Sequence, residues 1–392
     1  MIWVMLAILA VVSIMVVYSA TGTLAYSKYH GDTYTFLMRQ SFFVISALML
    51  AYIVHLVDLK VYYWLSKVLV WVSFPLLLIT MAMGASLNEA SRWLSIGGFT
   101  FQTSDFAKVA LVMYVAYMLA IHQNDIKDIR IFGRIMAMVG AVCILILPNN
   151  FSTAAMLGMI CIMLMFVGRV RIRHILLTGI AGIALFTMLF FTAKATGFQA
   201  HRLATWEKRA ATYMPSVFGG DEAKKPSRDD TFQADQSKIA IATGGILGKG
   251  PGNSTQRNYL PHPYSDFIYA IIIEEYGLVG GFIILIFYLA LLYRAGVLTK
   301  KSDKTFPAFL TMGLVLLLVV QAMINMGVAV GILPVTGQTL PFVSMGGSSL
   351  WMTGIVFGII QSANRKLMNP TSSKEEAPIK EKTEVKEAVE NE

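Results

Sequence analysis

The chain has 392 residues, of which 56% are hydrophobic and only 14% are charged, and its formal net charge is +9. Its mean hydropathy is +0.62, which is far too apolar for a soluble globule with a polar surface. The composition therefore excludes a soluble globular domain and indicates a polytopic membrane protein.

Apolar runs of about 17 to 25 residues, long enough to cross a hydrocarbon core of about 30 Å, recur along most of the chain. They predict an all-α fold with ten transmembrane helices. The expected ranges are 2–20, 40–57, 62–84, 105–122, 131–148, 153–168, 174–193, 267–293, 306–333 and 346–363. One large loop, residues 194–265, separates the seventh helix from the eighth. Residues 370–392 mix Lys and Glu with few large apolar residues, so we expect a disordered tail.

Basic residues mark one side of the membrane. They follow the fourth, sixth, eighth and tenth segments, with Lys127, Arg171 and Arg294 as examples. The loops 148–152 and 334–345, on the other side, contain no Lys or Arg. The positive-inside rule therefore predicts that both termini are cytoplasmic and that the large loop faces outside.

Asp266 stands where the large polar loop turns into the eighth apolar segment. Pro261 and Pro263 exclude a helix before it, and Ser265 is suited to cap the helix that follows. We therefore expect Asp266 to begin a helix at the outer membrane surface, where a carboxylate meets both water and lipid. An acid in a first helical turn can also do no more than complement the helix dipole, so its neighbours must decide its role.

Two further features of the outer region leave alternatives open. Glu274 and Glu275 lie inside the eighth segment, where an ionisable group is costly and therefore a functional candidate. In an unbroken helix Glu275 points away from Asp266, whereas Glu274 either lines a polar cavity or is a protonated or lysine-paired structural acid. The glycine-rich stretch 243–250 fails the Walker A pattern, and with Lys249 it either cradles a phosphate or forms a flexible turn.

Charged residues also surround the start of the fourth segment. Arg92 beside Trp93 is either an interfacial anchor or part of a site. Ser104 is expected to cap the helix. Asp105 and Lys108 are three residues apart and so share one helical face, either within a site or as a surface pair.

Residues 334–349 contain two prolines and three glycines and cannot form a regular helix. Such irregular backbone is tolerated at a membrane only where it is buried in protein or lines a cavity. We therefore expect a re-entrant or loop segment that borders a substrate path.

Together these motifs resemble the shape, elongation, division and sporulation (SEDS) family of polytopic peptidoglycan glycosyltransferases, which includes FtsW, RodA and SpoVE. The resemblance covers about residues 1–369, which would form one transmembrane glycosyltransferase domain that includes loop 194–265. Its motifs are Arg92-Trp93, Gln102-Thr-Ser-Asp105-Phe-Ala-Lys108, Gln236-Ser-Lys-Ile-Ala, Gly248-Lys-Gly250, Asp266-Phe-Ile, Glu274-Glu-Tyr-Gly277, Leu333-Pro-Val-Thr-Gly and Ser344-Met-Gly-Gly-Ser-Ser349.

Some positions refine the resemblance and others depart from it. Asn325 and Thr339 are more similar to the division enzymes than to the elongation enzymes. Asp105 replaces the usual Glu, which shortens the side chain by one methylene, Asn149 replaces an acid, and Met345 replaces the usual Tyr.

The resemblance implies polymerisation of lipid II on the outer face of the membrane during septal wall synthesis. The 4-hydroxyl of one sugar attacks the anomeric carbon of another lipid II, undecaprenyl pyrophosphate leaves, and the anomeric centre inverts. Asp266 is the expected general base. Substrate or pyrophosphate binding is expected from Arg92, Asp105, Lys108, Lys249, Ser344, Gly346 and Gly347, with Glu274 as a cavity acid.

Partners and localisation also follow from the resemblance. A divalent metal ion, Mg²⁺ or Mn²⁺, is a candidate cofactor for the leaving group; neither an organic cofactor nor a nucleic-acid partner is expected. The expected partners are lipid II, a class B penicillin-binding protein transpeptidase and other division proteins. The expected location is the bacterial cytoplasmic membrane at the division septum.

Three other functions stay open from the sequence. A lipid II flippase would use Glu274 and Glu275 along a polar path through the membrane. An elongation enzyme of the RodA type would perform the same chemistry away from the septum. A scaffold would recruit other division proteins, with or without catalysis.

Overall fold

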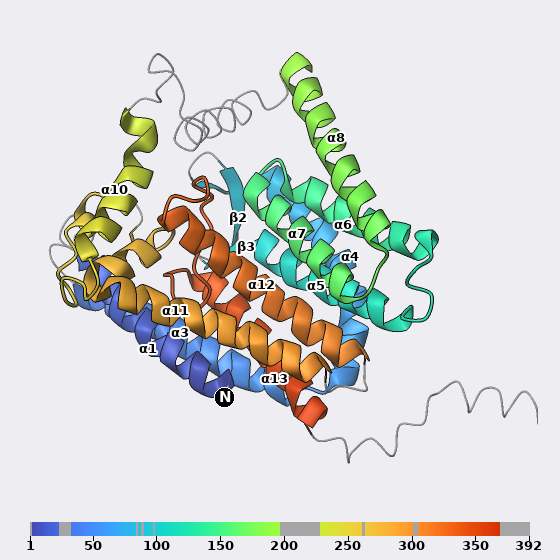
Figure 1. Ribbon diagram of the computed structural model, residues 1–392, viewed down its shortest axis with the longest axis horizontal. Coiled ribbons are helices and arrows are strands. Elements are labelled where there is room, and N and C mark those ends of the chain that lie inside the picture. Colours follow the sequence, from blue (N-terminus) through green and yellow to red (C-terminus); the bar gives the residue numbers. More distant parts are fainter. Residues whose placement is uncertain are drawn as a thin grey trace, which may run out of the picture.

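The computed structural model describes residues 2–22, 33–83, 85–87, 90–96, 99–196, 228–260, 263–300 and 305–368. Helices dominate this part of the chain (Figure 1). Residues 370–392, for which a disordered tail is predicted, lie outside the described residues. Residues 197–227 of the large loop also lie outside them.

Each of the ten predicted apolar segments overlaps one helix. These helices are α1 (Ile2–Ala20), α3 (Thr33–Leu56), α4 (Leu59–Met83), α5 (Thr103–Ile121), α6 (Ile129–Ile146), α7 (Phe151–Val167), α8 (Ile172–Thr196), α11 (Ile268–Lys300), α12 (Thr305–Ala329) and α13 (Gly347–Met368). Among the described residues, seven helices are long and apolar enough to cross a membrane: α1, α3, α4, α5, α6, α11 and α12. The polytopic helical fold is therefore confirmed, while ten crossings remain a prediction.

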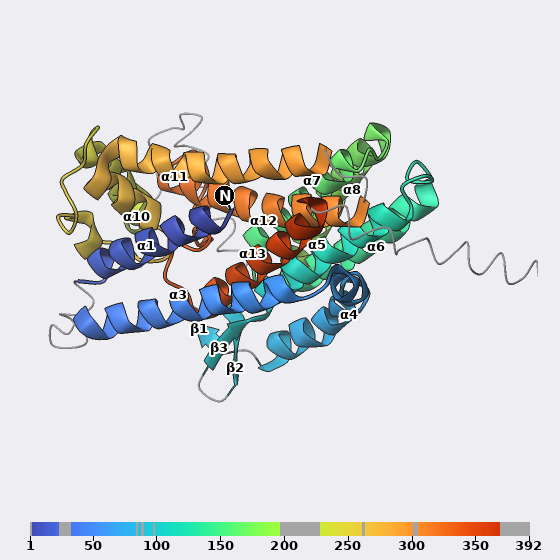
Figure 2. The same ribbon diagram turned by 90° about the horizontal axis from the view of Figure 1, so that it is seen from below.

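Helix α12 is the centre of the bundle. It packs against α5, α7, α11 and α13, and nearly all of its side chains are buried (Figure 1). Helix α3 runs along α13, and α1 lies beside both α3 and α11 (Figure 2). Large apolar side chains on the outside of the bundle, such as Trp64 and Phe282, are exposed, as expected where lipid covers a helix surface.

A small antiparallel sheet joins α4 to α5 and was not predicted. Its strands β1 (Ala85–Leu87), β2 (Ala90–Ile96) and β3 (Phe99–Gln102) follow the order β1-β2-β3, with Trp93 opposite Gln102. The expectation of an all-α fold was therefore wrong for residues 85–87, 90–96 and 99–102. Trp, Ile, Phe and Thr favour strands, but β1 and β3 are short and the sequence of β2 does not strictly alternate apolar and polar residues, so no period-two pattern reveals the sheet.

The described part of the large loop contains a helix, α10 (Arg228–Gly244), and a short 3₁₀ turn, η2 (Gln256–Asn258). Helix α10 packs against the first part of α11, next to the end of α1 (Figure 1). The described part of the loop is therefore folded onto the bundle at the end of α11 where Asp266 lies.

Candidate active site

Asp266 lies in a turn, half-buried, two residues before the start of α11 at Ile268. The predicted helix start was thus placed two residues early, and Ser265 is too far from the helix to cap it. The Ser265 hydroxyl donates instead to Asp266 Oδ1 at 2.9 Å. This hydrogen bond fixes the orientation of the carboxylate.

Three consecutive backbone carbonyls hold the turn that carries Asp266. Tyr264 O accepts from Met345 N at 2.9 Å, and Ser265 O accepts from Ser344 Oγ at 2.7 Å. Asp266 O accepts from Asn325 Nδ2 at 2.8 Å. All three donors come from α12 and the irregular segment that follows it. The Asp266 backbone is therefore attached to the centre of the bundle.

Gly337 of the same irregular segment and the Tyr264 phenol lie near the Asp266 carboxylate. Gly337, with a φ of +69°, passes so close that an added Cβ would lie 3.6 Å from Asp266 Oδ2. Burial raises the pKa of the Tyr264 phenol, the Asp266 charge raises it further, and Arg39 lowers it. The phenol is therefore protonated near neutral pH, beside the carboxylate.

Asp105 and Lys108 form a buried ion pair at the start of α5, so the alternative of a surface pair is wrong. Lys108 Nζ lies 2.8 Å from Asp105 Oδ1, with side-chain exposures of 7% and 8%. The other carboxylate oxygen, Asp105 Oδ2, is buried and has no hydrogen-bond partner among the described residues. Ser104 does not cap this helix, because Gln102 is the N-cap residue and makes no side-chain capping bond.

Two amide side chains on α12 connect this ion pair to the Asp266 turn. Gln321 Oε1 accepts from Lys108 Nζ at 3.2 Å, and Gln321 Nε2 donates to Thr339 O at 3.0 Å. One turn later, Asn325 Nδ2 donates to Asp266 O and, at 2.7 Å, to Gln338 O. The structure therefore brings Asp105, Lys108 and Asp266 together around one helix.

Neither amide was predicted as a site residue. Asn325 was used only to distinguish subtypes within the family, and Gln321 was not considered. A signal was present, since two amides four residues apart share one face of a helix that is otherwise apolar and buried.

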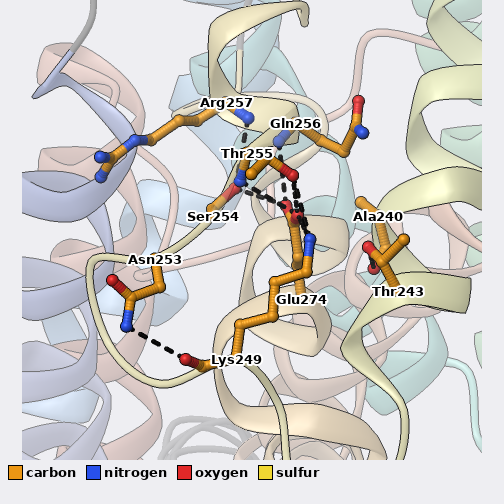
Figure 3. Close-up of polar contacts among 9 residues, drawn as sticks. All are labelled: Ala240, Thr243, Lys249, Asn253, Ser254, Thr255, Gln256, Arg257 and Glu274. Carbon is orange, nitrogen blue, oxygen red and sulfur yellow. Dashed lines mark hydrogen bonds and ion pairs between the residues drawn. The ribbon is translucent and has the colours of Figure 1, made fainter.

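Glu274 and Lys249 form a separate cluster at the loop (Figure 3). Glu274 is fully buried and its carboxylate accepts from Lys249 Nζ at 2.6 Å and from Ser254 Oγ at 2.5 Å. It also accepts from the Thr255 hydroxyl and from the backbone N–H groups of Thr255 and Gln256. This geometry favours the lysine-paired structural acid over a cavity acid, and it occupies the Lys249 ammonium.

The glycine-rich stretch packs against the backbone of α11 where that helix is interrupted. Gly277 has a φ of +71° inside the helix, so the helix is interrupted there. Residues 245–250 insert at the break: Lys249 N and Gly250 N donate to the carbonyls of Glu274 and Glu275, each at 2.9 Å. In return, Leu278 N donates to Gly245 O at 2.9 Å. The glycines therefore contact protein backbone, which neither sequence interpretation anticipated.

The remaining predicted site residues lie on β2 and at the start of α13. Arg92 lies on β2, and its side chain is outside the described part of the structure. Gly347 begins α13, where an added Cβ would lie 2.8 Å from the Phe43 ring, so its contact is with protein. Gly346 precedes it, beside Ser349.

The described residues contain no group of three or more His, Cys, Asp or Glu side chains that could hold a metal ion. A Mg²⁺ ion usually needs only one or two carboxylates when substrate phosphates complete its coordination. The unpartnered Asp105 Oδ2 fits that mode of binding, so the predicted divalent metal would have to be shared with a substrate.

Comparison with known proteins assigns the chain to a family. The model described as "Cell cycle protein", for FtsW, RodA and SpoVE, matches residues 1–369. The chain belongs to this family. Stage V sporulation protein E of Bacillus subtilis (strain 168) is 31% identical over 367 residues, covering 91% of this chain and 94% of the relative. A Geobacter sp. (strain M18) protein named "Probable peptidoglycan glycosyltransferase FtsW" is 31% identical over 368 residues, covering 93% of this chain and 95% of the relative.

Solved structures agree with this assignment. A chain from work described as "Structural coordination of polymerization and crosslinking by a peptidoglycan synthase complex" has a TM-score of 0.68 and 26% identity, covering 92% of this chain and 97% of that chain. The crystal structure of Thermus thermophilus RodA shares the fold, with a TM-score of 0.64 and 23% identity. The match covers 92% of this chain and 96% of the RodA chain. The family predicted from the motifs is confirmed.

Proposed function

We propose that the protein is a peptidoglycan glycosyltransferase that polymerises lipid II, with Asp266 as the general base. Its relatives named as peptidoglycan glycosyltransferases support the reaction class. The observation that carries the assignment of residues is the attachment of the Asp266 turn and the buried Asp105–Lys108 pair to the same helix, α12.

The chemistry requires one base and a stabiliser for the leaving group. The Asp266 carboxylate accepts the proton of the attacking sugar 4-hydroxyl, whose oxygen forms the new bond to the anomeric carbon of a second lipid II. The bond to undecaprenyl pyrophosphate breaks in the same step, so the anomeric centre inverts and no carboxylate nucleophile is needed.

Among the cations whose side chains the structure describes, Lys108 is the best candidate to stabilise the negative charge that develops on the pyrophosphate. Its ammonium group is buried, where an electrostatic interaction is stronger than in water, and Gln321 and Asp105 hold it in position. Arg92 is retained as a second candidate. Lys249 would first have to leave Glu274. A divalent metal ion, when bound at Asp105 with the phosphates, would add positive charge there.

The proposed setting is the bacterial cytoplasmic membrane at the septum, with ten spans, cytoplasmic termini and Asp266 on the outer face. The proposed partners are a class B penicillin-binding protein and other division proteins. A related chain in a peptidoglycan synthase complex supports such a partnership. No observation favours the elongation role over the division role.

The flippase alternative loses its main support from the loop geometry. It relied on Glu274 as an acid that lines a polar path, but both Glu274 oxygens accept hydrogen bonds from the loop. A carboxylate engaged by this many donors is suited to holding the loop on α11.

We predict that Asp266→Asn abolishes glycan polymerisation without loss of folding. Amide replacement keeps the shape but removes the base, which typically contributes about 10²–10⁴-fold to a rate. Purified wild type, Asp266→Asn and the control Asp235→Asn, an exposed acid on α10, are incubated with labelled lipid II and the class B partner. The polymer is measured on gels.

The control should polymerise like wild type. Polymer from Asp266→Asn within about tenfold of wild type would contradict the base assignment. Movement of lipid II across vesicles without polymer from wild type would indicate a transporter, and neither activity would indicate a scaffold.

A further inference from the structure

The turn before α11 has no regular secondary structure, and its backbone carbonyls depend on outside donors. Residues 264–266 precede the helix, so their carbonyls need partners from elsewhere if they are shielded from water. The partners are Met345 N, Ser344 Oγ and Asn325 Nδ2. These three bonds restrain the backbone on both sides of the peptide that precedes Asp266.

The donor groups of the two side chains, Asn325 and Ser344, are already committed to the protein. The Ser344 hydroxyl is buried, donates to Ser265 O and accepts from Leu340 N at 2.8 Å. Asn325, 1% exposed, uses both amide hydrogens, one on Asp266 O and one on Gln338 O. These geometries are suited to holding protein backbone, and they leave neither donor directed at a substrate.

Asn325 also helps to fix the position of Asp266 relative to Lys108. It donates to Gln338 O, while Gln321, one turn earlier, donates to the next carbonyl, Thr339 O. The other contact of Asn325 is the Asp266 backbone, and the other contact of Gln321 is the Lys108 ammonium. One rigid helix and one pair of adjacent residues therefore fix both charged groups relative to each other.

We propose that Asn325 and Ser344 are positioning residues that hold the Asp266 turn in register with Lys108, and that neither binds lipid II directly. This inference rests on the proposed function, because a positioning role has meaning only if Asp266 is the general base. A small displacement of a base can cost about 10²-fold in rate while leaving the substrate contacts intact. The expected effect is therefore on kcat and not on KM.

The test uses the full-length protein with its class B partner. Asn325→Leu removes both amide donors at similar size, and Ser344→Ala removes the hydroxyl. Asn325→Gln keeps the donors on a longer stem and should retain intermediate activity, which covers the case in which Asn325→Leu does not fold.

Matched controls lie at the other end of α13. Ser362→Ala removes a buried hydroxyl that donates to Val57 O at 2.7 Å, and Gln361→Leu removes a buried amide. Both changes remove the same kinds of group without touching the Asp266 turn. They should leave kcat within about threefold of wild type, and their melting temperatures calibrate the structural cost of such losses.

We expect Asn325→Leu and Ser344→Ala to lower kcat for lipid II polymerisation by at least about tenfold, with KM within about threefold of wild type. A raised KM with unchanged kcat would overturn the proposal, since it would make these residues substrate contacts. Losses no larger than those of the controls would overturn it as well.

The proposed function is tested separately by Asp266→Asn in the same assay. If Asp266→Asn is active, the base assignment fails and no positioning role remains for Asn325 and Ser344. If Asp266→Asn is inactive while Asn325→Leu and Ser344→Ala match their controls, only the positioning role fails.

Discussion

Stability alone does not explain why the ion pair of Asp105 and Lys108 is buried. Removing two charges from water costs several kcal/mol, and their attraction often does no more than offset that cost. Here one oxygen, Asp105 Oδ2, is buried without a partner in the described part of the chain. A buried pair with one unsatisfied oxygen fits a group that receives a ligand better than it fits packing.

We predict that these two charges serve turnover rather than folding. Lys108→Met leaves the Asp105 carboxylate buried and unpaired, which should cost about 3–5 kcal/mol of stability as well as activity. The double variant Asp105→Asn/Lys108→Met has no buried charge, so its melting temperature should recover. Its polymerisation should stay at least about 10²-fold below wild type. Recovery of activity together with stability would make the pair structural.

Among the elements, α11 shows how glycine permits two backbones to approach. Gly248 and Gly277 both have positive φ, and an added Cβ on either would overlap the backbone of the other segment. The carbonyls and N–H groups released by the helix break are satisfied by residues 245–250. The Glu274 carboxylate in turn accepts hydrogen bonds from residues within 249–256 of the loop and so holds this part of the loop in place. Residues 245–256 of the loop and the first part of α11 therefore form one unit.

We predict that Gly248→Ala destabilises the protein more than Gly245→Ala does. Both residues have positive φ, at +83° and +57°, so both variants carry backbone strain. Only at Gly248 does the new methyl group meet backbone, whereas Gly245 has open space. The clash should add about 1–3 kcal/mol, seen as a lower melting temperature in detergent. Equal melting temperatures would mean that the loop does not depend on this close approach.

The ten apolar helices could be predicted because each contains a long apolar run, and length alone distinguishes such a run. The polar helix α10 has no such run and was not predicted. The contacts between elements could not. Asp266 was identifiable as a charge at an apolar boundary, but Asn325 holds its carbonyl from 59 positions along the chain. The glycines of 243–250 predicted freedom of the backbone without indicating what would approach it.

In the whole molecule, polar side chains gather at one end of an apolar bundle. Lys108 of α5, Thr153 of α7, Asp266 and Asn325 are joined there through Gln321 and Gln338. Two loops on this side, residues 148–152 and 334–345, lack Lys and Arg, which is the pattern that the positive-inside rule predicts for an outer face. An outer location of Asp266 is therefore the condition on which the proposed reaction depends.

We predict that single cysteines report this orientation in intact cells. In a background without Cys143 and Cys161, Asn253→Cys lies in the exposed loop beside Lys249, and Gln123→Cys lies in the exposed turn after α5. A membrane-impermeant maleimide should label Asn253→Cys before lysis and Gln123→Cys only after permeabilisation, because charged reagents do not cross the hydrocarbon core. Labelling in the opposite order would place Asp266 on the cytoplasmic side. Asp266 could then not act in polymerisation of lipid II on the outer face.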